Sequence, residues 1–247
     1  MKIALFADIH ANRQAFEACL RAAGEAGAKR WVLLGDQVGY GADPAWCVDR
    51  VMALAEQGAI VVQGNHDAAA AGAKESMSRP AGEAMDFTRA QLSQAQRKFL
   101  AELPLIANDG NRCYVHADAS APQRWNYVHD SEDAGKHFDA CAAQISFCGH
   151  VHIPALYSRA PTGKAVNHFA PIADNPLPLL PQRHWFAVTG SVGQPRDGDS
   201  AAAWCLLDTA RNELRFMRTA YDIDAAQAAI RAAGLPEALA ARLARGR

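Results

Sequence analysis

Five short apolar runs in this chain each stop abruptly at an Asp, Asn or His side chain. The first of these runs, residues 2–7, ends at Asp8 and His10. A short apolar run with such a boundary is typical of a buried strand. Because open α/β sheets bind ligands beyond the carboxyl ends of their strands, we expect the five polar ends to converge. The other four runs end at Asp36, at Asn65-His66-Asp67, at His116 and at His150-Val151-His152.

Helical patterns alternate with the first three apolar runs. Asn12 is the expected N-cap of a helix over residues 14–26, which a glycine follows. Asp43 and Pro44 begin a second helix, which extends to about residue 57. The resulting order of strand, helix, strand, helix and strand predicts a parallel sheet with right-handed crossovers.

Residues 68–104 break this alternation. Residues 68–73 are small and are predicted to be loose, and two helices are expected over residues 80–92 and 94–102. Ser93 begins the second helix with a capping box. Long insertions between strands and helices are often functional. Two interpretations stay open: a helical cover for the core, and a lid that shapes a substrate pocket.

The second half of the chain reads mostly as β-structure. A hairpin is expected to turn at Asp109-Gly110, and residues 117–130 read as a long polar loop. Between residues 153 and 217, five short strands are expected to form a second sheet packed on the first, interrupted by a proline-rich surface loop. The chain then ends in two short helices separated by Gly234.

Composition argues against several classes of function. The formal net charge of −1 gives no electrostatic footprint for nucleic acid or anionic lipid. We see no signal-peptide pattern and no apolar run long enough to span a bilayer, so we expect a cytoplasmic protein with no membrane partner. The six cysteines include no CxxC pair and are expected to be reduced and buried. A homo-oligomer is compatible with the sequence.

The strand-end side chains predict a metal centre. Seven of them are nitrogen or oxygen donors, which is too many for one tetrahedral ion and suits two adjacent ions. Two ions about 3.5–4 Å apart polarise a phosphoryl oxygen and activate a water molecule. The donor set suits Mn, Fe, Zn or Ni better than Ca, which prefers more carboxylates. The predicted ligands are Asp8, His10, Asp36, Asn65, His116, His150 and His152.

These residues also carry a family resemblance. Asp8-x-His10, Gly35-Asp36, Gly64-Asn65-His66-Asp67, a lone His116 and Gly149-His150-x-His152 follow one another in the order of the calcineurin-like metallophosphoesterase motifs. The surrounding sequence is similar to the small bacterial and archaeal phosphodiesterase-like branch of that family. The resemblance implies a metal-dependent phosphoric ester hydrolase in a single domain over residues 1–247. It also implies an α/β fold, a four-layered α/β sandwich with two facing mixed β-sheets flanked by helices.

The resemblance implies a role for each residue of the site. A hydroxide between two metals attacks phosphorus in line, and His66 lies near the leaving-group oxygen as the general acid, with Asp67 holding its ring. The alternatives are a structural role for His66 and a capping role for Asp67. The implied ligand sets are Asp8, His10 and His152 for one ion, Asn65, His116 and His150 for the other, and Asp36 for both.

Four side chains are candidates for contact with a substrate. Asn12 is fully explained as an N-cap, to which a phosphate contact would be an addition. Tyr40 could equally pack or touch the substrate. Arg196 is a candidate for pairing with a phosphate group. Arg124, with the aromatic residues that follow it, could clamp a base or fill the surface.

The sequence leaves several functions to compare. Protein phosphatases of this family carry an Arg after the Gly-Asp motif, where this chain has Gly39-Tyr40-Gly41, so small-molecule phosphodiesters or nucleotides are favoured as substrates. Hydrolysis of dinucleoside polyphosphates (Ap4A-type) is an alternative, with Trp125 or Tyr127 stacking on a base. A catalytically silent binding scaffold is the non-enzyme alternative, and the complete ligand set argues against it. A nuclease is disfavoured because the chain lacks a basic groove.

Overall fold

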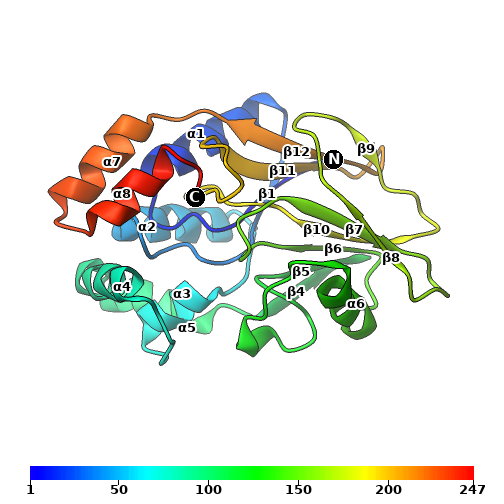
Figure 1. The fold of residues 1–247 in the computed structure, drawn as a ribbon, viewed down its shortest axis with the longest axis horizontal. Helices are drawn as coiled ribbons and strands as arrows, with labels where there is room; N and C mark the ends of the chain where they lie inside the picture. Colours follow the sequence, from blue (N-terminus) through cyan, green and yellow to red (C-terminus); the bar gives the residue numbers. More distant parts are fainter.

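The computed structural model describes all 247 residues. It contains two six-stranded β-sheets and eight α-helices (Figure 1). Sheet 1 has the strand order β3-β2-β1-β11-β12-β9. In that order its strands are Ile60–Val61, Arg30–Leu33, Lys2–Phe6, Ala202–Asp208, Glu213–Thr219 and Leu177–Pro178.

Sheet 2 contains the remaining strands in the order β4-β5-β6-β10-β7-β8. Both sheets are mixed: β1, β2 and β3 run parallel, as do β5, β6 and β10, while the other pairings are antiparallel. The strands of sheet 2, in the same order, are Ile106–Asp109, Arg112–Val115, Ile145–Cys148, His184–Val188, Ala155–Arg159 and Val166–Phe169.

Five helices come before the middle of the chain and three come after it. They begin and end as follows: α1 Arg13–Glu25, α2 Pro44–Glu56, α3 Asn65–Ala71, α4 Arg79–Gln91, α5 Gln94–Glu102, α6 Ser131–Ala140, α7 Ile223–Ala232 and α8 Glu237–Leu243. Asn12 caps α1 by accepting a hydrogen bond from the Ala15 amide, and Ser93 and Gln96 form the predicted capping box of α5.

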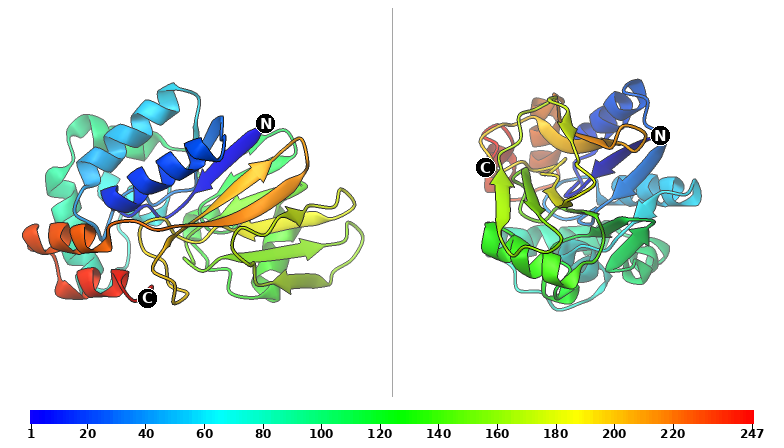
Figure 2. Two further views of the ribbon diagram at one scale, coloured as in Figure 1. Left: turned by 90° about the horizontal axis from the view of Figure 1, so that it is seen from above. Right: turned by 90° about the vertical axis from the view of Figure 1, so that its right-hand side faces the viewer.

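The alternation of side chains along β1 explains the layers. Ile3 and Leu5 point into the core between the two sheets, whereas Ala4 and Phe6 point into a second core beneath α1 and α2. On the far side, α6 covers the outer face of sheet 2 through a third apolar cluster that includes Phe138. Helix, sheet, sheet and helix therefore form four layers, which confirms the predicted sandwich (Figures 1 and 2).

The remaining helices gather at one end of the two sheets. Figure 1 shows α3, α4 and α5 at one side of that end and α7 and α8 at the other. The predicted helices over 80–92 and 94–102 are present as α4 and α5. All of these helices lie beyond the carboxyl ends of β1 and β2, where the predicted metal ligands begin.

Several predictions about individual segments were wrong. β11 and β12 do not join the second sheet: β11 pairs with β1, so both strands complete sheet 1. Residues 68–71 are not loose but helical, because α3 begins at Asn65 and the run of alanines continues it. α6 was not predicted at all, and the proline-rich loop contains the short strand β9.

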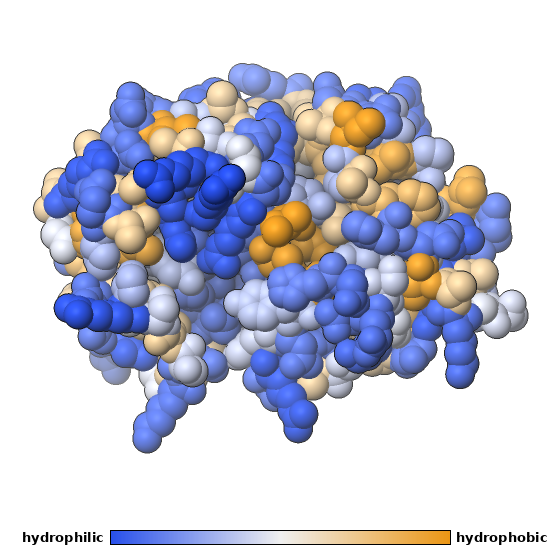
Figure 3. Space-filling model, viewed as in Figure 1, coloured by the Kyte–Doolittle hydropathy of each residue, from blue (hydrophilic) through white to orange (hydrophobic).

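The face of the molecule drawn in Figure 3 has no large apolar patch. Figure 3 shows a mostly hydrophilic face with a few separate hydrophobic patches. No helix has the length and apolar character needed to cross a membrane. All six cysteines are free and buried, as predicted.

Candidate metal centre

The five predicted strand ends meet at one place, although they come from two sheets. Asp8, Asp36 and Asn65 follow β1, β2 and β3 of sheet 1, while His116 and His150 follow β5 and β6 of sheet 2. The Asp and His side chains at these strand ends form three overlapping buried groups, and within each group the ligand atoms lie within 4.8 Å of one another. The groups are Asp8, His10 and His152; His10, Asp36 and His66; and Asp36, His116 and His150.

The backbone of this site is strained in an unusual number of places. Asp8, His10 and Asp36 have φ values of 54°, 50° and 54°. His150 and His152 have φ values of 65° and 64°. Residues with a Cβ atom rarely adopt this left-handed region, and such strain concentrates at functional sites because the surrounding structure must impose it. The loops therefore turn sharply enough to aim five side chains at one point.

Motif glycines allow the loops to approach one another. A Cβ atom at Gly149 would lie 2.5 Å from Asp8 Oδ2, and one at Gly64 would overlap the Asp36 carboxylate. This close approach permits hydrogen bonds between the loops. The His150 amide donates to Asp8 Oδ2 at 2.9 Å. The His66 amide likewise donates to Asp36 Oδ1 at 2.8 Å. These bonds fix both carboxylates in place.

Four histidine rings are also held by hydrogen bonds to the backbone. One ring nitrogen of each faces a main-chain carbonyl, which can only accept a hydrogen bond, so that nitrogen carries the proton. The carbonyls belong to Val38 for His10, Gln194 for His152, Leu34 for His116 and Trp125 for His150, at 3.1, 2.6, 2.7 and 2.9 Å respectively.

The other ring nitrogens face each other in two close pairs. His10 Nε2 lies 3.1 Å from His152 Nε2, and His116 Nε2 lies 3.1 Å from His150 Nδ1. Two ring nitrogens at this distance repel each other unless a proton or a metal ion lies beside them. Asp8 Oδ1 is also buried without any hydrogen-bond partner. Buried histidine nitrogens and carboxylate oxygens in this arrangement are suitable ligand atoms for divalent transition-metal ions.

Asp36 lies between the two histidine pairs. Its Oδ2 atom is 3.4 Å from His116 Nε2 and 3.7 Å from His10 Nε2. Burial opposes ionisation of this carboxyl, but His116 and His66 hold its pKa well below the usual range. Asp36 is therefore a carboxylate within reach of both groups of histidines.

Burial and neighbouring charges set the protonation of the histidines. Burial, followed by the nearby His116, lowers the pKa of His150 to about 3. Burial and His152 lower the pKa of His10 well below its ordinary value. For His116 burial acts in the same direction, but the carboxylates of Asp36 and Asp8 outweigh it and raise the pKa to about 9. His10 and His150 are thus neutral imidazoles, the form that binds a metal ion.

A cavity of about 230 Å³ opens directly over these residues. Its floor includes Asp36, Asn65 and the ring of His66, and its walls include Tyr40 and Arg196. The His66 ring packs against both His10 and Tyr40, with ring centroids 4.9 and 4.5 Å away. Of the residues predicted to contact a substrate, Tyr40 and Arg196 therefore lie at the site.

The two other predicted substrate contacts do not lie there. Asn12 uses its side-chain oxygen to cap α1 and its amide to donate to Gly193 O at 2.9 Å, so both ends are occupied away from the cavity. Arg124 is exposed and does not line the cavity. The geometry of the cavity therefore gives no support to a substrate contact by either residue.

Asp67 also differs from its prediction. Its two oxygens accept hydrogen bonds from the Gln37 and Gly64 amides at 2.9 and 3.0 Å, while His66 Nδ1 has no partner. Asp67 therefore does not hold the His66 ring. It caps α3 and ties the loop after β3 to the loop after β2.

The two hydrogen bonds accepted by Asp67 should contribute to the stability of the protein. Asp67→Asn leaves one of the two buried amides without an acceptor, which should reduce the free energy of unfolding by about 1–3 kcal/mol. Urea unfolding of both proteins measures the difference. An unchanged urea midpoint would show that Asp67 does not hold these loops together.

Sequence reasoning missed other residues around the cavity. Ser76, Met77 and Ser78, in the loop before α4, line it, and no local pattern distinguishes them from ordinary loop residues. Gln194 holds His152 through its main-chain oxygen and lies within the Gly190–Asp197 segment that carries the family resemblance. Its position in that segment is the one sequence feature that could have indicated a role at the site.

The chain belongs to the calcineurin-like phosphoesterase superfamily. The sequence model of that superfamily's domain matches residues 1–212. Membership makes the chain a phosphoric ester hydrolase of a metal-dependent family, and the buried Asp and His groups could bind metal ions.

Three individual relatives are similar to this chain over almost its full length. An uncharacterised protein of Methanocaldococcus jannaschii is 33% identical over 99% of this chain and 98% of its own. The crystal structure of a metallophosphoesterase from Sphaerobacter thermophilus has 35% identity and a TM-score of 0.89, covering 100% of this chain and 99% of that one. A hypothetical protein from Pyrococcus horikoshii has 18% identity and a TM-score of 0.79, covering 100% and 98%, and supports the fold alone.

Proposed function

We propose that this protein hydrolyses small-molecule phosphodiesters or nucleotides with two divalent metal ions. The observation that carries the proposal is the close pairing of histidine ring nitrogens on either side of Asp36. One ion would be held by the group around Asp8 and His10, and the other by the group around His116 and His150. Asp36 would contact both. When bound, Mn, Fe, Zn or Ni ions would polarise the phosphoryl oxygens and lower the pKa of the attacking water.

The residues of the chain would position and protonate the substrate. Arg196 would pair with a phosphate oxygen from the cavity wall. His66 faces the same cavity and would give a proton to the leaving-group oxygen. Burial lowers the pKa of His66, which makes its protonated form a stronger acid. Tyr40 would keep the His66 ring in place through the ring contact described above.

The size of the cavity supports a small substrate. Its volume of about 230 Å³ suits a phosphate group with a compact substituent, and residues 76–78 close one side of it. A folded phosphoprotein would need an open groove. We therefore place the protein-phosphatase alternative below small phosphodiesters.

A dinucleoside polyphosphate is the second candidate substrate, because of Tyr127. This residue is 47% exposed, lines the cavity and stacks on His150 with ring centroids 4.2 Å apart. Its ring also stacks on His129, with centroids 5.2 Å apart, so a base would stack on Tyr127 by taking the place of one of these histidines. Trp125, the other aromatic candidate, instead uses its indole N–H to bind Glu75.

Turnover by the metal-loaded protein tests this proposal. Purified protein is treated with a chelator, reloaded with Mn²⁺ and assayed against phosphomonoesters, phosphodiesters and dinucleotides. We expect hydrolysis of the diesters or nucleotides that the chelator abolishes and Mn²⁺ restores. A folded, metal-loaded protein that hydrolyses no phosphate ester would instead support the binding-scaffold alternative.

We also propose that the helical insertion over residues 68–104 acts as a lid. Residues 76–78 and Ala81 of this segment line the cavity. Glu75 accepts a hydrogen bond from the Trp125 indole at 3.1 Å, which links the insertion to the loop after β5. Ser76 and Tyr127, close in sequence to Glu75 and Trp125, both line the cavity, so this bond would hold the lid closed over a bound substrate.

The lid proposal predicts a binding defect in Trp125→Phe. The variant keeps the aromatic ring but loses the bond to Glu75, at a cost of about 1 kcal/mol, so KM should rise about fivefold with kcat nearly unchanged. Trp185→Phe is the matched control, because its indole N–H binds Leu180 O at 3.1 Å away from the cavity. Equal KM values for the two variants would contradict the lid.

A further inference from the structure

Two arginines, of which Arg196 lines the cavity, meet at the side chain of Gln194 without any acidic partner. Arg196 donates from Nε and Nη2 to Gln194 Oε1 at 3.3 and 2.9 Å. Arg242, from α8, donates from Nη1 to the same oxygen at 2.9 Å. Neither guanidinium group forms an ion pair with a carboxylate, although nine other arginines of the chain do. One neutral oxygen thus holds two positive charges together.

Both arginines also lie over the ring of Tyr40. The guanidinium carbons of Arg196 and Arg242 are 5.8 and 6.0 Å from the ring centroid. Aromatic faces attract cations but do not neutralise them. Arg242 Nε is buried without a partner, and burial together with Arg196 lowers the Arg242 pKa. The pair therefore keeps an unsatisfied donor and an uncompensated positive charge beside the site.

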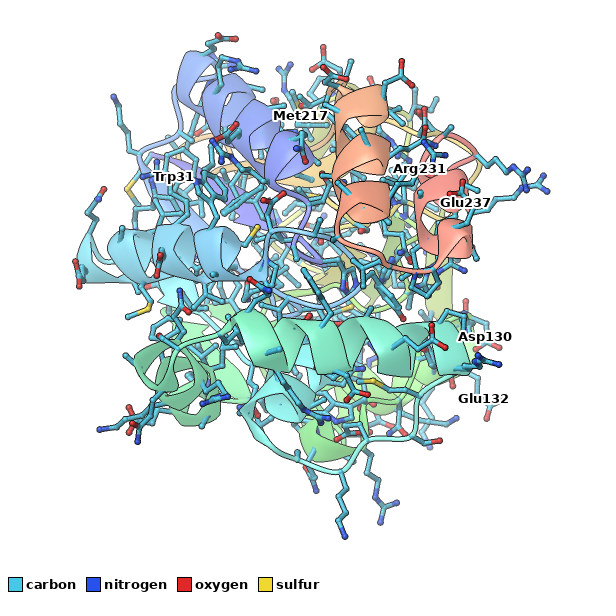
Figure 4. All side chains as sticks on the ribbon, turned by 90° about the vertical axis from the view of Figure 1, so that its left-hand side faces the viewer. Trp31, Asp130, Glu132, Met217, Arg231 and Glu237 are labelled. Carbon is cyan, nitrogen blue, oxygen red and sulfur yellow. The ribbon has the colours of Figure 1, made fainter.

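The C-terminal helices hold Arg242 in this position. Leu239 and Leu243 of α8 pack with Ile230 of α7 in one apolar cluster, against which Tyr40 also packs. At the other end of α8, Glu237 pairs with Arg231 of α7 at 2.7 and 2.9 Å (Figure 4). Figure 4 shows α7 and α8 side by side, with α7 next to α1. This helical pair lies outside residues 1–212, which match the superfamily domain.

Gln194 connects the arginines to the metal centre. It is only 2% exposed, and its main-chain oxygen accepts the hydrogen bond from His152. The Arg196 amide donates to His152 O at 3.2 Å. The two guanidinium groups are therefore held at a set position relative to a predicted metal ligand, and Arg196 reaches the cavity itself. Planar guanidinium groups bind phosphate oxygens through paired hydrogen bonds.

We propose that Arg196 and Arg242 form an anion subsite for a second phosphate group of the substrate. A phosphate at the metal ions would be the one hydrolysed, and the neighbouring phosphate would bind the two arginines. The substrate class would then be molecules with at least two phosphate groups, such as nucleoside or dinucleoside polyphosphates. This inference rests on the proposed phosphoesterase function and makes its substrate more specific.

Equilibrium binding tests the subsite without requiring turnover. Calorimetry on the Mn²⁺-loaded full-length protein compares methylenediphosphonate, which has two phosphonate groups, with methylphosphonate, which has one. We expect the diphosphonate to bind more tightly, and Arg242→Met to reduce this preference by about tenfold or more. Met keeps an apolar stem against Tyr40. Arg245→Met is the matched control, since Arg245 is an exposed arginine three residues away, and it should leave the preference unchanged.

A second variant separates charge from structure. Gln194→Glu is nearly isosteric and places a carboxylate between the two arginines, so it should strengthen their attachment but neutralise part of their charge. We expect the preference for the diphosphonate to fall in this variant too. An unchanged preference in Arg242→Met and Gln194→Glu would overturn the proposal. Equal weakening of both ligands would also overturn it, because the arginines would then serve the phosphate at the metals.

Failure of this proposal is distinguishable from failure of the proposed function. If the enzyme hydrolyses phosphodiesters but the variants keep the full preference, only the second-phosphate subsite is wrong. If the preference falls as expected but no ester is hydrolysed, the anion subsite stands and the hydrolase reaction is wrong.

Discussion

Replacing Asp36 with Asn should abolish turnover and weaken the binding of both metal ions. Asp36 is the one carboxylate within reach of both histidine pairs, at 3.4 Å from His116 and 3.7 Å from His10. An amide supplies only one neutral oxygen and cannot bind two cations equally well. Loss of several kcal/mol of transition-state stabilisation corresponds to a rate reduction of about 10³-fold or more. Phosphodiesterase assays and metal analysis of the purified variant measure the two effects.

Asp67→Asn is the matched control for this experiment. It makes the same chemical change in a neighbouring buried carboxylate that binds only backbone amides. We expect it to reduce stability while both ions stay bound. If Asp36→Asn kept two ions per chain and near wild-type activity, Asp36 would not be the shared ligand.

Replacing His66 with Asn or Ala should lower turnover by about 10²–10⁴-fold while the metals stay bound. The size of the loss should depend on the leaving group. An alkyl alcohol needs a proton as the P–O bond breaks, whereas a nitrophenolate leaves readily without one. The loss should therefore be largest for alkyl esters. The His66 side chain lines the cavity and is absent from both close histidine pairs, but it forms one of the three candidate metal-holding groups with His10 and Asp36. Metal analysis of the variant therefore separates a general acid, whose loss leaves both ions bound, from a ligand, whose loss does not.

The controls for His66 are chosen to exclude a structural cause. His168→Asn changes an exposed histidine that stacks on Tyr157 on sheet 2, and it should have full activity on both classes of ester. If His66→Asn cleaved an alkyl ester at the wild-type rate, the general-acid role would be wrong. A uniform loss on all esters would point to a role in shaping the cavity instead.

The sequence predicted the convergence of the ligands because strand ends and loop chemistry are local features. An apolar run that stops at Asp8 and His10 predicts both the strand and the side chains at its end. The parallel arrangement of β1, β2 and β3 follows from their intervening helices. Together these signals placed residues from 8 to 152 at one site.

Other features depend on contacts between distant segments and could not be predicted in this way. Pairing of β11 with β1 places residue 205 beside residue 5, and nothing in the local alternation specifies that partner. The acceptors of Asn12 and the donors to Asp67 are likewise backbone groups whose positions depend on the complete fold. The contact of Arg242 with Gln194 joins residues 48 positions apart, which no local pattern predicts.

The most direct test of this account is an anomalous X-ray diffraction measurement on crystals grown with Mn²⁺. The account predicts two anomalous peaks: one among Asp8, His10 and His152, and one among Asn65, His116 and His150, with the Asp36 carboxylate touching both. A single ion, or no ion at this meeting point of the two sheets, would contradict it.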